Sequence, residues 1–216
     1  MHAATLVVFA VIVALVFLSP GPTLSLLSSA AADRAPGAGL ATLAGACGAI
    51  ATYAAAGLLI VELALATSPA VFALLKTLGS CYLVWHGAIA LYEAWAAPGA
   101  ALAPPPSSEV PRGPGESLRY GWRTSLLNPK PALICVCALL QLVSIDTGSI
   151  LVQGRLFASV LLVVAALCYG AVATDLLPMD RWLSRSRVIQ VVLTATAAIL
   201  VALGLQSLGV RSSSLL

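Results

Sequence analysis

Long stretches without a single charged side chain constrain this sequence more than any other feature. Four of them are close to 20 residues long or longer, and they comprise residues 1–32, 35–61, 156–174 and 188–210. The hydrocarbon core of a bilayer is about 30 Å thick, so roughly 20 consecutive apolar residues cross it as a helix. Charged residues make up only 9% of the 216-residue chain, against about 25% in a soluble domain. The chain is therefore predicted to be an integral membrane protein, which excludes soluble enzymes and nucleic-acid-binding proteins.

Short polar or proline-containing segments divide the chain into six predicted transmembrane helices. Their approximate ranges are 4–30, 38–65, 70–95, 121–143, 150–176 and 188–209. The continuous apolar runs favour helices, because the strands of a membrane barrel alternate polar and apolar residues. We therefore predict an all-α membrane protein.

The region between the third and fourth helices differs in kind from the other connections. Residues 97–118 contain six of the chain's 13 prolines, and such a segment is typical of a flexible linker. We predict a first three-helix repeat in residues 1–96, a Pro/Gly-rich cytoplasmic linker in 97–118 and a second three-helix repeat in 119–216, all in one membrane domain. An odd number of helices in each half turns the second half upside down relative to the first, which gives the inverted-repeat architecture of many transporters.

The distribution of Lys and Arg predicts the orientation of the chain in the membrane. Loops one, three and five hold seven basic residues, which are Arg34, Arg112, Arg119, Arg123, Arg181, Arg185 and Arg187. The opposite side holds three, which are Lys76, Arg155 and Arg211. Cytoplasmic loops are enriched in basic residues, so both termini are predicted to lie outside the cytoplasm.

Paired prolines interrupt the first and fourth predicted helices. The first contains Ser19-Pro20-Gly21-Pro22 and the fourth contains Asn128-Pro129-Lys130-Pro131. Each proline removes a backbone hydrogen bond and disfavours helical geometry at the residue before it. Such breaks persist inside a membrane only where protein or a wet cavity surrounds them. Interrupted helices at corresponding positions of two repeats mark the substrate site of many transporters; the alternative is a pair of kinked structural helices.

Four side chains near these breaks are candidates for contact with a solute. Lys130 either pairs with a solute carboxylate or phosphate, or extends to the cytoplasmic interface. Ser19 and Asn128 either cap the broken backbone or hydrogen-bond a solute. Tyr53, in the second predicted helix, either packs against a neighbouring helix or lines the cavity. The predicted substrate-binding residues are thus Ser19, Pro20, Gly21, Pro22, Tyr53, Asn128, Pro129 and Lys130.

The two proline motifs also carry a family resemblance. Ser19-Pro20-Gly21-Pro22 and Leu126-Leu127-Asn128-Pro129-Lys130 resemble motifs of the lysine exporter family, the LysE/RhtB-type amino-acid translocators. The resemblance implies a secondary transporter in the bacterial inner membrane that exports amino acids or related small metabolites by alternating access and is energised by the proton gradient. Many members carry an acidic residue in the middle of the second helix, whereas residues 45–53 here contain none. Thr52 and Tyr53 are the polar side chains available in its place.

Other classes of function have less support in the sequence. No His-Glu-x-x-His motif of a zinc protease is present, so we expect neither an enzyme nor a bound metal, and no cofactor is predicted. The expected partners are a small-molecule substrate and the lipid bilayer, without nucleic acid, and a homodimer is left open. Two alternatives also stay open: a scaffold or accessory membrane protein without transport, and an exporter of a different small solute.

Overall fold

The computed structural model is helical throughout the residues that it describes, which are 3–32, 37–95, 113–143, 149–177 and 186–213. In chain order the helices are α1 (Ala3–Leu18), α2 (Pro22–Ala32), α3 (Ala38–Thr67), α4 (Pro69–Trp95), α5 (Pro114–Leu126), α6 (Pro129–Leu142), α7 (Ile150–Ala173) and α9 (Ser186–Ser213). By length and composition, α3, α4, α7 and the Arg187–Gly209 part of α9 can each cross a membrane. The α1–α2 pair qualifies as one further, bent span. The chain is thus a membrane protein with several spans.

The observed helices agree with most of the predicted ranges and differ in the fourth. With 13 and 14 residues, α5 and α6 are each shorter than the roughly 20 residues that a span needs. Four spans, or five with the bent pair, therefore qualify, and the count of six stays a prediction. Residues 114–118, which we assigned to the linker, are the first turns of α5, because Pro114 starts the helix and Glu116 lies in its first turn. Residues 97–112 lie outside the described residues.

A short turn joins α3 to α4 at the predicted Ser68-Pro69 segment. Ser68 has an extended backbone, and its hydroxyl accepts hydrogen bonds from the amides of Ala70 and Val71 at 3.1 and 3.3 Å. This is the geometry of an N-cap, with proline at the first helical position. The cap ends one long helix and starts the next without an intervening loop.

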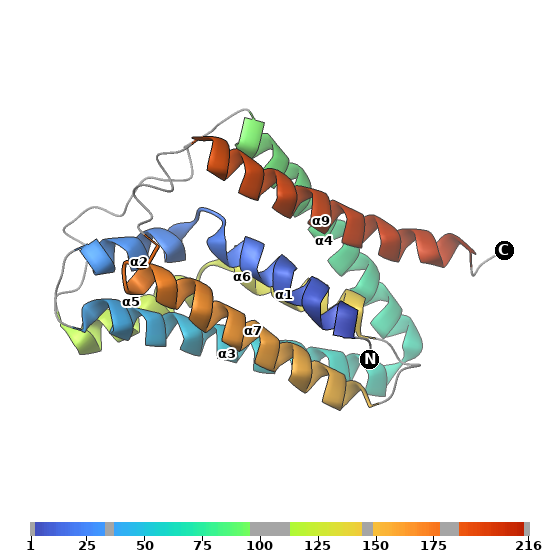
Figure 1. Cartoon of the computed structure of the whole chain (residues 1–216). Helices are drawn as coiled ribbons and strands as arrows, with labels where there is room; N and C mark the ends of the chain where they lie inside the picture. Colours follow the sequence, from blue (N-terminus) through green and yellow to red (C-terminus); the bar gives the residue numbers. More distant parts are fainter. Residues whose placement is uncertain (1–2, 33–36, 96–112, 144–148, 178–185, 214–216) are drawn as a thin grey trace.

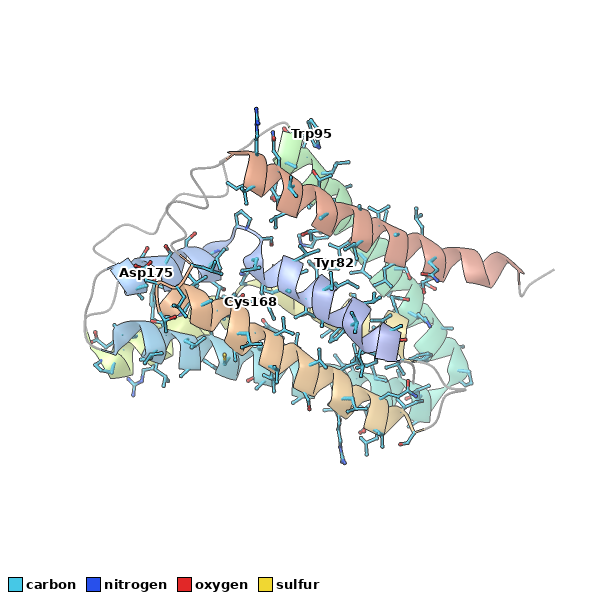
Figure 2. The ribbon with its side chains drawn as sticks, in the orientation of Figure 1. Tyr82, Trp95, Cys168 and Asp175 are labelled. Carbon is cyan, nitrogen blue, oxygen red and sulfur yellow. The ribbon has the colours of Figure 1, made fainter. Side chains whose placement is uncertain are left out.

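The broken helices lie in the middle of the bundle. Figure 1 shows α1 and α6 between the α4–α9 pair on one side and the α3–α7 pair on the other, while α2 packs against α3, α5 and α7. A core cluster joins the α4–α9 pair to this middle layer; its buried members are Ile12, Val16, Leu83, Ile134, Cys137 and Leu200. Tyr82 packs against the same cluster and lies between α9 and α1 in Figure 2. At the end of α4, Trp95 is 69% exposed, as expected for an aromatic residue at a membrane interface.

Contacts along α7 show that it runs parallel to α1 and antiparallel to α3. The contacts with α1 are the ring pairs Phe9–Phe157 and Phe17–Tyr169, with centroids 4.9 and 5.0 Å apart, and those with α3 are Gly39 beside Ala173 and Leu58 beside Gly154. α1 and α3 therefore run in opposite directions.

Glycines allow two other helix pairs to approach closely. Gly45 of α3 lies against the backbone of Leu118 in α5, and Gly57 lies against Val136 in α6, so α3 runs parallel to the α5–α6 pair. Small residues at such interfaces let helix backbones come together inside a membrane.

The α4–α9 pair is antiparallel and is built on the same principle. A Cβ added to Gly87 of α4 would lie 2.7 Å from Val201, and one added to Gly204 of α9 would lie 2.6 Å from Val84. The same added Cβ atoms would lie 3.0 Å from the Ala197 carbonyl oxygen and 2.8 Å from the Ser80 carbonyl oxygen, so a larger residue at either position would require the two helices to shift.

Candidate functional site

The first break separates α1 from α2 at Ser19, Pro20 and Gly21. The two helices are bent by 67°, and Pro22 starts α2, where a missing amide proton costs nothing. The Ser19 hydroxyl donates to the carbonyl of Val16 at 2.8 Å. Ser19 thus caps the end of its own helix, which is the local one of the two roles considered for it.

The second break separates α5 from α6 at Leu127 and Asn128. The amide of Leu127 still donates to the carbonyl of Arg123 at 2.9 Å, and that of Asn128 donates to Ser125 at 3.3 Å. Pro129 then starts α6 and Lys130 is its second residue; the side chains of these two residues lie outside the described part of the structure. The break therefore falls where the Asn-Pro-Lys-Pro motif predicts it.

Direct contact joins the two breaks, although they are about 100 residues apart in sequence. The Asn128 side-chain amide donates to the Thr23 hydroxyl oxygen at 3.2 Å, and the Ser125 hydroxyl donates to the same oxygen at 3.4 Å. A Cβ added to Gly21 would lie 4.0 Å from the Asn128 amide nitrogen. We call Thr23, Ser125 and Asn128 the inter-break cluster; their side chains are 2%, 4% and 8% exposed. Asn128 therefore reaches across to the other break.

Tyr53 of α3 lies beside the second break. Its hydroxyl donates to the backbone carbonyl of Leu126, the last residue of α5. Carbonyls in the last turn of a helix have no partner within that helix, so the phenol supplies a hydrogen bond that the break would otherwise lose. The structure thus brings Tyr53 to the same place as the proline motif.

Two hollows adjoin at Tyr53 and Leu161, which line both of them. The break chamber has room for about one water molecule and is lined by Phe17, Ile50, Tyr53, Ser125, Pro131, Leu161 and Tyr169. The apolar chamber also has room for about one water molecule and is lined by Phe9, Tyr53, Ala54, Gly57, Leu58, Val136, Leu139, Phe157, Ala158 and Leu161. Both hollows lie beside helices that flank the breaks, and an amino acid would fit there only after these helices move apart.

The predicted site residues divide into two groups in this arrangement. Tyr53 lines both chambers, whereas Ser19, Pro20, Gly21, Pro22 and Asn128 are not among the residues that line them. Pro20 is buried and Pro22 is exposed. The residues of the first break therefore set the backbone geometry next to the break chamber, and the side chains of other residues form its wall.

Sequence reasoning missed several residues that the structure places at this site. Thr23 and Ser125 complete the inter-break cluster, and Phe17, Leu161 and Tyr169 line the break chamber. A local signal exists for the first two, because each is a hydroxyl residue within one helical turn of a proline break. No such signal marks Leu161 and Tyr169, which reach the site through the packing of α7.

Comparison with known proteins identifies the family. Residues 14–209 match the family model described as LysE type translocator. The match covers most of the chain, includes both proline breaks and Tyr53, and confirms the resemblance expected from the two motifs. Neither the curated proteins nor the solved structures compared with the chain contain a match. A multi-pass membrane protein with this match over nearly its whole length belongs to the LysE type translocator family.

Proposed function

We propose that the protein is a secondary transporter that exports amino acids or related small metabolites across the bacterial inner membrane by alternating access. The observation that carries the proposal is the contact of two broken helices through the buried side chains of Asn128 and Thr23. Irregular backbone inside a membrane is tolerated where it is enclosed by protein or lines a cavity. Two such breaks in contact with each other, next to two chambers, are expected in a transporter with a solute-binding site and are not needed in a scaffold protein.

An inverted pair of three-helix repeats accounts for the directions of the helices. In this arrangement α1–α2, α3 and α4 correspond to α5–α6, α7 and α9. The first elements of the two halves run in opposite directions, and the same holds for α3 with α7 and for α4 with α9. The opposite directions support a six-span repeat architecture, because an inverted second half requires opposite directions. The distribution of Lys and Arg supports the placing of both termini outside the cytoplasm.

Ends of the four half-helices can bind both charges of an amino acid. The amino-terminal ends of α2 and α6 carry a partial positive charge, which suits a carboxylate. Because Pro22, Pro129 and Pro131 have no amide proton, the amides available to it are those of Thr23 and Leu24 in α2 and of Lys130 in α6. The carboxyl-terminal ends of α1 and α5 carry a partial negative charge, which suits an ammonium group, although Ser19 and Tyr53 already donate to one carbonyl at each end. We assign Lys130 to the carboxylate as well, because the second residue of α6 lies at such an amino-terminal end.

Alternating access follows if the inter-break cluster opens and closes during the transport cycle. In the observed state Thr23 accepts hydrogen bonds from two residues of the second repeat. Rocking of the repeats would break these bonds and open the break chamber on one side, while the other side closes. We assign the driving force to the proton gradient, as in the family resemblance.

Reconstituted transport tests the proposal directly. Purified protein in liposomes is expected to exchange radiolabelled amino acids, and an overproducing bacterial host is expected to tolerate higher amino-acid concentrations. The Thr23→Val variant removes the shared acceptor and should lower exchange at least tenfold. The matched control is Thr196→Val: Thr196 is equally buried, at 2%, but its hydroxyl donates within its own helix to Val192.

Two outcomes would contradict the proposal. If well-folded wild-type protein exchanges no amino acid or related metabolite, the protein is an accessory membrane protein or carries a different solute. If Thr23→Val and Thr196→Val retain equal exchange, transport does not depend on the contact between the breaks.

A further inference from the structure

A second polar contact between helices lies at the end of α6 away from its break. The Gln141 side-chain amide donates to the backbone carbonyl of Lys76 in α4 at 2.9 Å, and its oxygen accepts a hydrogen bond from the Ser207 hydroxyl in α9. We call Lys76, Gln141 and Ser207 the far cluster. One amide side chain thus joins α6 to both helices of the α4–α9 pair.

A glycine of α4 makes room for this amide. A Cβ added to Gly79 would lie 3.2 Å from the Gln141 amide nitrogen and 3.5 Å from the Cys137 sulfur. Cys137 lies one turn before Gln141 on α6 and is 7% exposed. The face of α6 that carries these two residues is therefore covered by α4 while the far cluster is intact.

The far cluster and the inter-break cluster lie at different depths of the bundle. Asn128 precedes α6 and Gln141 is close to its end, and the rise of this 14-residue helix places the two residues about 20 Å apart. The two chambers, which α6 helps to line, each have room for about one water molecule. Neither chamber admits an amino acid in this state, so release of a solute along α6 requires the far end to open.

The contacts of α4 differ in kind on its two sides. Toward α9, Gly87 and Gly204 bring the two backbones into close contact along the pair, which suits helices that move as one body. Toward α6, the far cluster supplies hydrogen bonds, which can break and form again. One hydrogen bond between helices in a membrane shifts an equilibrium about 3-fold on average and about 18-fold at most. Such a contact can hold a closed state and still open during a transport cycle.

We propose that the far cluster is a gate of the transport pathway and that it opens when α6 moves away from the α4–α9 pair. In the proposed orientation it is the outer gate, and the inter-break cluster lies nearer the cytoplasm. The two clusters open at different times, because alternating access exposes one side at a time. This inference rests on the proposed function and adds the contact that moves when the solute leaves.

A tether across the gate tests the inference. Gln141→Cys with Ser207→Cys, in a variant whose five native cysteines are replaced by alanine, is joined by a short bifunctional maleimide. The reagent should lower amino-acid exchange in liposomes at least about tenfold relative to the same variant without it, because a locked gate stops alternating access. The matched control is Ala94→Cys with Leu193→Cys, from the cluster that joins α4 to α9. Its crosslinking should change exchange less than about twofold, because these two helices move together.

Labelling of Cys137 follows the opening of the gate without any solute. In a variant that keeps Cys137 as its single cysteine, Gln141→Leu should raise the rate of maleimide labelling in detergent about 3- to 18-fold. Gln206→Leu is the control, because Gln206 is exposed on α9 next to Ser207, and it should leave the rate unchanged. This comparison decides if the Gln141→Cys, Ser207→Cys variant shows no exchange before the reagent is added.

The outcomes separate this inference from the proposed function. Exchange that persists after the gate is crosslinked, or equal labelling of Cys137 in Gln141→Leu and Gln206→Leu, overturns the gate and leaves the transporter in place. An equal loss of exchange in both crosslinked pairs also overturns it, because a tether within the α4–α9 pair should be tolerated. Absence of amino-acid exchange by the wild-type protein overturns the proposed function, and this inference with it.

Discussion

The hydroxyl of Tyr53 is the most informative single group to remove. Tyr53 lies about 22 Å from the start of α3 by helical rise, near the middle of a 30-residue helix. The Tyr53→Phe variant keeps the ring that lines both chambers and removes the hydrogen bond to the Leu126 carbonyl. Any effect on transport therefore comes from the loss of this one donor at the end of α5 and not from a change in cavity shape.

The expected magnitude follows from hydrogen bonds between helices in membranes. Such bonds contribute about 0.6 kcal/mol on average and up to about 1.7 kcal/mol. Since 1.36 kcal/mol corresponds to a factor of ten, the conformation with an ordered second break should lose population by about 3- to 18-fold. We expect exchange by Tyr53→Phe to fall by a factor in this range.

The measurement is amino-acid exchange in liposomes, with the melting temperature of the detergent-solubilised protein as a check on folding. Tyr92→Phe is the matched control, because Tyr92 is exposed on α4. Exchange by Tyr53→Phe equal to that of Tyr92→Phe would refute a role for the hydroxyl in ordering the break. A loss far above the stated range would also refute it, because one supporting hydrogen bond cannot account for such an effect.

Two further predictions concern the scaffold around the site. Gly121→Ala should destabilise the protein by about 1–3 kcal/mol, because the added Cβ would lie 3.0 Å from the Thr42 Cα and closer still to its carbonyl oxygen. The control is Gly115→Ala on the same helix, which meets open space and should stabilise the protein by up to about 1 kcal/mol. Equal melting temperatures of the two variants would contradict the close approach of α3 and α5. Ser68→Ala removes the N-cap of α4 and should cost about 1 kcal/mol in thermal or denaturant unfolding, whereas Ser159→Ala, whose hydroxyl bonds within α7, should cost less.

Local sequence signals predicted the breaks and the turn between α3 and α4 because proline acts through its own backbone geometry. Pro22 and Pro129 are the first residues of α2 and α6, and Ser68 before Pro69 caps α4. The beginning of α5 was placed too late, because Pro-rich composition masked a helix start at Pro114. Thr23 and the chamber walls could not be predicted in the same way. Their roles depend on which helices pack together, and several packings are compatible with the same apolar periodicity.

Enclosure of the breaks links the fold to the proposed transport cycle. A broken helix exposed to lipid would leave backbone groups without partners, at a cost of several kcal/mol each. Here α3 and α7 cover one side of α1 and α2, and α4 and α9 pack against α1 and α6 on the other. Within that cover the backbone groups at the breaks receive hydrogen bonds from a neighbouring tyrosine or cap themselves, as Ser19 does. In the proposed cycle a solute would replace these partners when the surrounding helices move, so we expect binding and movement to be coupled at the interhelical contact of Asn128 with Thr23.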